Sequence, residues 1–200
     1  MTNLIALSGY AQSGKDTFGS VLSVEHGFYR VAFADAIKRM ALNLDPILEV
    51  DQDVIETEED EPYKVRLSDI VKTLGSLDKA KELPAVRAYL QRLGVECRDM
   101  FGKDAWTTAA RLSEALAEHG YVVVTDCRFK SEAQAVKDLG GIVVRVKRSG
   151  VGPANSHISE HDLDDWPFDA VVNNDGSVVE LYAQAGALSR GDWPGSKGQG

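Results

Sequence analysis

The sequence has little cysteine, no long apolar run and no excess of positive charge, and each shortage excludes a class of protein. Only two cysteines, Cys97 and Cys127, occur in 200 residues, and they lack the CxxC spacing of a redox or zinc motif. We expect two reduced thiols in a reducing compartment. No stretch approaches the roughly 20 apolar residues of a membrane span, and the apolar run at residues 4–7 is too short for the core of a signal peptide. We therefore expect a cytoplasmic protein without a membrane partner.

Negative charge predominates, with 31 Asp and Glu against 22 Lys and Arg and a formal net charge of −9. A protein that binds nucleic acid independently of its sequence needs a basic face, so we expect no nucleic acid polymer as a partner. A nucleotide is not excluded, because one local cluster of positive groups can hold it. The oligomeric state stays open between a monomer and a homodimer.

Short apolar segments alternate with helical patterns in the first and last parts of the chain. The patterns predict strands at 3–8, 28–33, 121–126, 141–148 and 169–174, and helices at 15–27, 36–44, 69–75, 84–93, 105–119, 130–139 and 178–189. This alternation predicts a three-layer α/β fold, with a five-stranded, mostly parallel sheet and helices on both faces. Nearly ninety residues separate the second strand from the third, which indicates a functional helical insertion.

We expect a single domain over residues 1–190. Its core would comprise 1–45 and 120–190, with the insertion over about 46–119 and a flexible tail over 191–200. Residues 49–61 carry eight carboxylates and no basic residue. Because like charges repel one another, this segment favours a solvated loop over a metal site.

The segment Gly9-Tyr10-Ala11-Gln12-Ser13-Gly14-Lys15 fits the pattern GxxxxGK between a predicted strand and a predicted helix. That context predicts a phosphate-binding loop for a nucleoside triphosphate. Gly9, Ser13 and Gly14 would let the backbone N–H groups surround a phosphate at the positive end of the helix. Lys15 would reach the β- and γ-phosphates and follow the charge during transfer.

Asp16 stands where such a loop normally carries the hydroxyl ligand of magnesium, and Thr17 offers a hydroxyl one residue later. Asp16 either approaches the metal, directly or through water, or only caps the helix. Asp126, at the end of the third predicted strand, is a further oxygen ligand able to hold Mg²⁺ through water in the manner of P-loop enzymes. The predicted cofactors are therefore ATP and Mg²⁺.

A phosphorylated acceptor needs positive charge opposite this loop. Arg128 follows Asp126 at the carboxyl edge of the sheet, where its guanidinium can grip a phosphate with two hydrogen bonds; the alternative is a surface ion pair. Asp35 and Lys38 follow the second strand, where the acceptor's sugar or phosphate would lie. Asp35 is equally suited to cap the helix over 36–44.

A mobile cover over the site is predicted at residues 148–165, where Gly150, Gly152 and Pro153 flank a polar loop. Arg148, at its start, would stabilise the transferring phosphoryl group. Arg145 and Lys147 alternate with valines, as on an exposed side of a strand. His157, Glu160 and His161 invite a zinc interpretation, but a third convincing ligand is lacking, and a hinge or capping role is favoured.

Several segments are similar to one known family. "SGYAQSGKDT" resembles the loop of phage-type deoxynucleoside monophosphate kinases, and residues 33–41, 90–106, 123–148 and 157–177 resemble further segments of the same enzymes. The SGKD loop and residues 159–164 are also distantly similar to animal-type phosphomevalonate kinase. The resemblance implies a P-loop kinase fold with an acceptor-binding insertion, and it adds Arg98, in "GVECRD", to the acceptor site.

The function implied by the resemblance is phosphorylation of deoxynucleoside monophosphates by in-line transfer of the γ-phosphoryl group of ATP. Lys15, Arg128 and Arg148 would carry catalysis. The acceptor would be held by Asp35, Lys38, Arg98, Asp126 and Arg128. Two alternatives remain: a kinase of phosphomevalonate or dephospho-coenzyme A, and a nucleotide-dependent switch.

Overall fold

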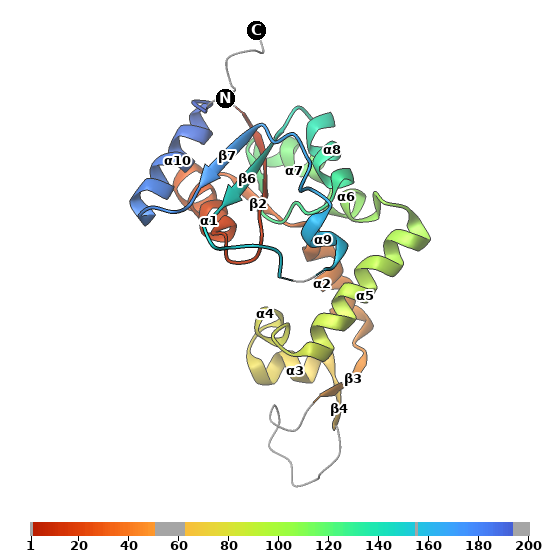
Figure 1. The fold of residues 1–200 in the computed structure, drawn as a ribbon. Coiled ribbons are helices and arrows are strands. Elements are labelled where there is room, and N and C mark those ends of the chain that lie inside the picture. The colour runs from red at the N-terminus through yellow and green to blue at the C-terminus, as the bar shows by residue number, and fades with distance from the viewer. Residues whose placement is uncertain (1, 51–62, 155, 194–200) are drawn as a thin grey trace. The chain divides into compact units, whose positions relative to one another are not determined.

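A computed structural model describes residues 2–50, 63–154 and 156–193 (Figure 1). The chain divides into two compact units: the first comprises Met1–Phe33 and Thr107–Gly200, and the second comprises Ala34–Trp106. The second unit is thus a contiguous segment inserted into the first. The sequence alone places the insertion at 46–119. Each unit has its own apolar cluster and is described by itself.

A five-stranded sheet forms the centre of the first unit. Its strands are β1 (Leu4–Ser8), β2 (Tyr29–Val31), β5 (Val122–Val124), β6 (Ile142–Lys147) and β7 (Ala170–Asn173). They lie in the order β2-β5-β1-β6-β7, and every neighbouring pair is parallel. All five residues of β1 are buried, as expected for the central strand of a parallel sheet. The predicted five-stranded sheet is confirmed.

Helices cover both faces of this sheet. On one side α1 (Lys15–His26) packs against α10 (Val178–Arg190), and on the other lie α7 (Leu112–His119) and α8 (Lys130–Asp138) (Figure 1). The predicted three layers are therefore confirmed. The helix predicted over 105–119 is divided into α6 (Ala105–Ala110) and α7, because Arg111 between them has a left-handed φ of 52°.

The main apolar cluster of the first unit lies between the sheet and the α1–α10 pair. It comprises the buried side chains of Ile5, Leu7, Phe18, Val21, Leu22, Phe28, Val123, Ile142, Val144, Val146, Ala170, Val172, Leu181, Ala185 and Leu188. Burial of this cluster holds the carboxyl ends of β1, β6 and β7 at one edge of the sheet. That edge is where ligands of parallel α/β sheets bind.

The second unit is mainly helical. It contains α2 (Phe33–Leu44, which begins at the last residue of the first unit), β3 (Ile47–Val50), β4 (Tyr63–Arg66), α3 (Leu67–Leu74), α4 (Leu77–Ala80) and α5 (Pro84–Phe101). Strands β3 and β4 form an antiparallel pair that the sequence did not predict. Of the acidic segment 49–61, residues 49 and 50 lie in β3 and the rest lie outside the described residues. A separate cluster of buried side chains includes Ala41, Val50, Val65, Leu67, Ile70, Leu77, Ala80 and Val86.

Helix α5 is longer than the sequence predicts, because it continues through Gly94 to Phe101. A Cβ at position 94 would lie 3.4 Å from Ile37 Cδ1, so α2 packs against α5 at this glycine. The Gly94 carbonyl also accepts a hydrogen bond from Trp106 Nε1 at 3.0 Å. Packing on both sides thus compensates for the low helix propensity of glycine.

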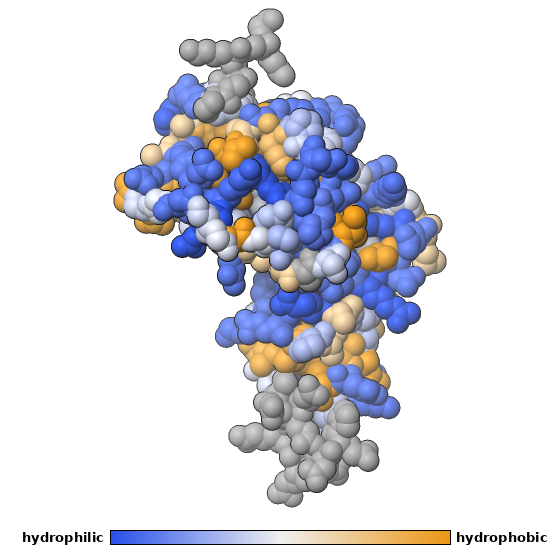
Figure 2. All heavy atoms as spheres, viewed as in Figure 1, coloured by the Kyte–Doolittle hydropathy of each residue, from blue (hydrophilic) through white to orange (hydrophobic). Residues whose placement is uncertain are grey.

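Within the described ranges, no helix is long and apolar enough to cross a membrane. Figure 2 shows that hydrophilic residues predominate on the visible face and that apolar residues form separate patches. Cys97 and Cys127 are both free thiols, as expected. Of the tail predicted at 191–200, Gly191 ends α10 with a left-handed φ of 85°, and residues 194–200 lie outside the described residues.

Candidate active site

The GxxxxGK segment connects β1 to α1, as predicted. Helix α1 begins at Lys15, directly after Gly14, whose φ of 94° is left-handed. Phe18 N–H donates to the Gly14 carbonyl at 2.9 Å and closes the first helical turn. Gln12 also has a positive φ of 66°. These conformations turn the chain sharply from the end of a buried strand into the start of a helix, where backbone N–H groups attract an anion.

Two close approaches fix the shape of this loop. A Cβ added to Gly9, whose φ is 153°, would lie 2.5 Å from the Val146 carbonyl oxygen and 2.6 Å from Ser13 Oγ. A Cβ on Gly14 would lie 2.1 Å from Nδ2 of Asn174, which follows β7 and donates to the Ser13 carbonyl at 3.0 Å. Gly9 is therefore required by space as well as by backbone conformation, and Gly14 is required by its left-handed backbone.

Two polar groups of the loop are buried. Ser13 Oγ has no hydrogen-bond partner among the described residues, although a buried hydroxyl normally has one. The Lys15 side chain is buried, and its Nζ lies 3.5 Å from the exposed Asp16 carboxylate. A cradle that holds an ammonium group and an unsatisfied hydroxyl next to a helix N-terminus fits a phosphate group.

Asp16 and Thr17 lie in the first turn of α1, and both side chains are exposed. The Asp16 side chain is 83% exposed, so it is accessible to a bound ion. Gly14 rather than Asp16 occupies the N-cap position, so Asp16 does not cap the helix. A carboxylate and a hydroxyl are the hard oxygen donors that Mg²⁺ prefers, and their chemistry is therefore compatible with that metal.

Asp126 and Arg128 lie just after β5, next to the end of β1. Cys127 N–H donates to the Leu7 carbonyl at 3.0 Å, which extends the β1–β5 pairing. Asp126 Oδ1 accepts the backbone N–H of Phe33 at 2.8 Å, so this carboxylate also holds the first residue of α2. The structure brings Asp126 and Arg128 to the same sheet edge as the phosphate-binding loop, as their positions in the sequence predict.

Arg128 is held at both its backbone and its side chain. The buried Glu132 carboxylate accepts the Arg128 N–H at 2.8 Å, and Arg128 Nη1 donates to Glu160 Oε1 at 2.7 Å. The Glu160 side chain is only 8% exposed. This ion pair joins the sheet edge to α9 (Ile158–His161), a short helix in the segment that the sequence assigns to a cover.

Arg145 is the main residue that sequence reasoning missed. We expected it on an exposed side of the strand, but it is 7% exposed, because its guanidinium packs over the rings of Tyr10 and Phe168. Its register partner in β1 is Ser8, at the start of the phosphate-binding loop. Alternation of charged residues with valine normally indicates a solvated strand face, so only the contacts with these distant segments reveal the burial.

A small pocket opens beside the loop. Ser8, Gly9 and Tyr10 line it together with Cys127, Arg128, Arg145, Ser159, Glu160 and Leu163. Burial, reinforced by the Glu132 and Asp126 charges, raises the pKa of the Cys127 thiol well above its usual value. Two arginines thus line this pocket. The Cys127 thiol stays protonated and therefore does not repel a bound anion.

The predicted cover contacts the loop directly. Tyr10 Oη donates to Asp164 Oδ1 at 2.7 Å. Burial and then the neighbouring Asp164 carboxylate raise the pKa of Tyr10, so its hydroxyl stays protonated as a donor. The histidines of this segment have local roles: His157 caps α9 by accepting the Ser159 N–H, and His161 Nδ1 lies 3.2 Å from Asp164 Oδ2.

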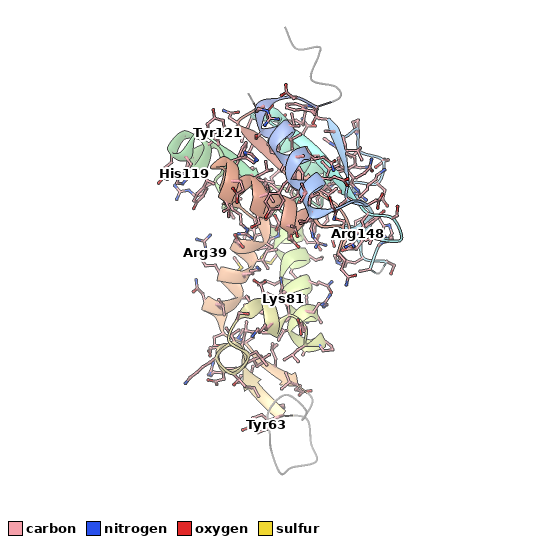
Figure 3. The ribbon with its side chains drawn as sticks, turned by 90° about the vertical axis from the view of Figure 1, so that its left-hand side faces the viewer. Arg39, Tyr63, Lys81, His119, Tyr121 and Arg148 are labelled. Carbon is pink, nitrogen blue, oxygen red and sulfur yellow. The ribbon has the colours of Figure 1, made fainter. Side chains whose placement is uncertain are left out.

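Arg148 is exposed on the loop after β6 and is labelled in Figure 3. Its carbonyl accepts the Val151 N–H at 3.1 Å in a turn at the start of the segment predicted to be the cover. Position 148 therefore presents a cationic side chain at the surface of the first unit, unlike the buried Arg145.

The remaining predicted acceptor residues belong to the second unit. Asp35 lies in the first turn of α2 and is not its N-cap, because the helix begins at Phe33. Lys38 Nζ lies 3.9 Å from Asp35 and donates to Asp78 Oδ1 at 2.9 Å. Arg98 is half-buried near the end of α5. Asp35 and Lys38 are thus close to each other, in an arrangement that also includes Asp78.

Sequence comparisons point to one family. A family model described as deoxynucleotide monophosphate kinase matches residues 41–185. The chain is 27% identical over 192 residues to a protein of Acanthamoeba polyphaga mimivirus provisionally given that name, a match that covers 90% of this chain and 93% of the viral protein. It is 31% identical over 110 residues to the deoxynucleotide monophosphate kinase of Escherichia phage RB69, covering 53% of this chain and 45% of the phage protein.

Solved structures share the architecture. The dephospho-CoA kinase from Campylobacter jejuni superposes with a TM-score of 0.50, covering 96% of this chain and 100% of that one. The two sequences are 14% identical, so this likeness concerns the fold alone. It agrees with the three-layer α/β arrangement of a P-loop kinase.

Proposed function

The chain belongs to the deoxynucleotide monophosphate kinase family, and on that premise we propose that it transfers the γ-phosphoryl group of ATP to deoxynucleoside monophosphates. The observation that carries the proposal is the loop at residues 9–15, where a buried lysine and an unsatisfied buried hydroxyl lie at the start of α1. This arrangement suits the β- and γ-phosphates of a triphosphate.

In the proposed reaction, an oxygen of the acceptor phosphate forms a bond to the γ-phosphorus. The bond from that phosphorus to the β–γ bridging oxygen breaks, and ADP leaves with the electron pair. The acceptor phosphate is already anionic at neutral pH, so the site needs no strong general base. Catalysis then consists of positioning and charge neutralisation.

The roles that we propose follow from the positions of the charged groups. Lys15 neutralises the charge that moves from the γ- to the β-phosphate during transfer. Arg128 grips the acceptor phosphate, once that phosphate replaces Glu160 as its anionic partner. Arg148 adds positive charge when the cover at 148–165 closes. Asp16, Thr17 and Asp126 would hold Mg²⁺, which would neutralise part of the triphosphate charge.

The second unit is proposed to bind the rest of the acceptor. Asp35, Lys38 and Arg98 are its candidate contacts. The Lys38 ammonium pairs with Asp78, and 22% of the Lys38 side chain is exposed. An acceptor phosphate or sugar at this position would compete with Asp78 for the same ammonium group.

The test is ADP release from Mg-ATP, measured in a coupled assay against dAMP, dGMP, dCMP, dTMP and their ribose counterparts. Controls without acceptor, with phosphomevalonate and with dephospho-coenzyme A separate this function from hydrolysis and from other kinases. We expect turnover on at least one deoxynucleotide and loss of transfer in Lys15→Ala. Lys147→Ala, which changes an exposed lysine on β6, is the matched control. Turnover only on a non-nucleotide acceptor, or ATP binding without any transfer, would refute the proposal.

A further inference from the structure

Arg145 is a buried cation in the middle of the sheet. Its guanidinium carbon lies 4.5 Å from the centre of the Tyr10 ring and 5.4 Å from the centre of the Phe168 ring. Nη1 lies 3.4 Å from Ser8 Oγ, and Nη2 donates to Asp164 Oδ1 at 3.2 Å. The guanidinium is a planar, delocalised cation whose donors match the geometry of carboxylate and phosphate.

The partner of this cation is much less buried than the cation itself. The Arg145 side chain is 8% exposed, whereas that of Asp164 is 40% exposed. Burial tends to raise the pKa of Asp164, but hydrogen bonds from Tyr10 and His161 and the charge of Arg145 bring it below its usual value. Asp164 is therefore an anion at neutral pH, and it is the more exposed partner of the pair.

A second arginine–carboxylate pair lines this pocket, with the opposite exposures: the Arg128 side chain is 38% exposed and that of Glu160 only 8%. Arg128 comes from the sheet edge and pairs with Glu160, and Arg145 comes from β6 and pairs with Asp164. Both carboxylates belong to one short segment, residues 160–164. Each of the two arginines that line the pocket thus pairs with a carboxylate of the predicted cover. The same pocket is lined by Ser8, Gly9 and Tyr10 of the loop.

We infer that Arg145 is a phosphate-binding residue of this pocket and that Asp164 takes the place of the phosphate while no substrate is bound. This inference rests on the proposed function, because that function brings phosphate groups to the loop. Carboxylate and phosphate both accept two parallel hydrogen bonds from a guanidinium, and a phosphate carries the larger charge. Substrate binding would replace Asp164 on Arg145 and release the Tyr10–Asp164 contact.

A purely structural ion pair would have other properties. A buried cation that only stabilised the fold would be served best by an equally buried carboxylate with fixed geometry. Here the cation is on a strand and lies against two rings, whereas the anion follows a four-residue helix and is 40% exposed. The Arg145 guanidinium is therefore held in place before substrate binds, and a phosphate can replace Asp164 as its partner.

The test measures equilibrium binding of ATP, ADP and dGMP separately, by titration calorimetry, to the wild type, Arg145→Gln, Asp164→Asn and the double variant. Loss of one charge-assisted hydrogen-bonding partner predicts that Arg145→Gln weakens binding about ten- to a hundredfold. If Arg145→Gln weakens the binding of ATP alone, Arg145 contacts the γ-phosphate. If it weakens the binding of dGMP, Arg145 contacts the acceptor phosphate. Asp164→Asn should tighten binding of the same ligand several-fold, because a competing anion is removed.

The double variant shows whether the two residues act together. In the Arg145→Gln background, Asp164→Asn should change the affinity little, since the cation for which Asp164 competes is absent. Lys147→Gln and Asp165→Asn are matched controls, because they remove exposed charges beside each residue and should bind as the wild type does. If Arg145→Gln does not fold, Arg145→Lys takes its place; it keeps the charge but not the paired donors, and it should weaken binding by a smaller factor.

Two results would overturn the inference: unchanged affinity for all three ligands in a folded Arg145 variant, or an Asp164→Asn variant that binds as weakly as the Arg145 variants. The binding measurements do not depend on turnover. A wild type that binds ATP but phosphorylates no deoxynucleotide would refute the proposed function, while the Arg145 comparison with ATP and ADP would still decide the inference.

Discussion

The side-chain amide of Asn174 donates to the main-chain carbonyl of Ser13 at 3.0 Å, which joins the end of β7 to the phosphate-binding loop. The backbone N–H of Asn174 in turn donates to the Lys147 carbonyl at 2.7 Å. Because a trans peptide is planar, its C=O and N–H point in opposite directions. Asn174 therefore sets the direction of the Gly14 N–H without touching a substrate.

We expect Asn174→Ala to raise the KM for ATP about two- to tenfold, which corresponds to the free energy of one hydrogen bond. The change in kcat should be smaller. The fold should persist, because Asn174 is only half-buried. Steady-state kinetics with varied ATP checks this, and Asn173→Ala, at the exposed neighbouring position, provides the control. An unchanged KM in Asn174→Ala would show that the loop keeps its shape without this contact.

Gly9→Ala should abolish nucleotide binding and lower the free energy of unfolding by about 1–3 kcal/mol. The new Cβ would collide with the Val146 carbonyl oxygen, a backbone atom of the central sheet that cannot move aside. Gly150→Ala is the matched control: its φ is 75°, but no atom lies within 4 Å of the added Cβ. Chemical denaturation and ATP titration should separate the two variants. If both variants lost the same ATP affinity and stability, the cause would be the strained backbone conformation and not the collision with Val146.

Arg128→Ala should raise the KM for the deoxynucleotide and also reduce stability, because it leaves the buried Glu160 carboxylate without its cation. Adding Glu160→Gln should restore much of the melting temperature but leave the acceptor KM raised. The comparison separates the catalytic contribution of Arg128 from its structural one. Recovery of the KM together with the melting temperature would mean that Arg128 acts only through the fold.

Acid should weaken a specific ion pair of the second unit. Hydrogen bonds from Lys38 and then Lys81 lower the pKa of Asp78 from 3.8 to about 2. Since the folded-state pKa lies below the unfolded one, the contribution of Asp78 is complete above about pH 5 and is lost as the pH falls from about 4 towards 2. This carboxylate is largely exposed, so the contribution stays under about 1 kcal/mol.

Melting temperatures of the wild type and Asp78→Asn measured between pH 3 and pH 7 check this prediction. Their difference should be constant above about pH 5 and shrink on acidification. Glu82→Gln, an exposed carboxylate on the loop after α4, controls for the general effect of removing one negative charge. A difference that grows as the pH falls would contradict the assigned direction of the pKa shift.

The five strands of the parallel sheet, the phosphate-binding loop and the family could be read from the sequence because local signals coincide there. The apolar run before Gly9, the GxxxxGK spacing and the helical pattern after Lys15 all indicate one structure. The positions of Asp126 and Arg128 followed from the same logic, since residues after parallel strands gather at one edge of the sheet.

The parts that the sequence did not reveal depend on contacts between distant segments. Arg145 is buried because Tyr10 and Phe168 pack against it. Asp35 is not a cap, because Asp126 holds the Phe33 N–H and the helix begins earlier. Similarly, Ser13 is held by Asn174 from the other end of the chain. These contacts depend on how distant segments come together in the fold, and local periodicity in the sequence does not predict them.

The order of the strands also decides when this molecule can assemble. The central strand β1 is synthesised first, but its sheet neighbours are β5 and β6, whose register partners begin at Val122 and Ile142. The intervening segment 34–106 is contiguous and has its own apolar cluster, so its contacts can form while β1 still lacks both neighbours. Because closure of long loops is slow, we expect formation of the phosphate-binding loop to be a late folding event. Nucleotide affinity should therefore be acquired only once the last third of the chain has been made.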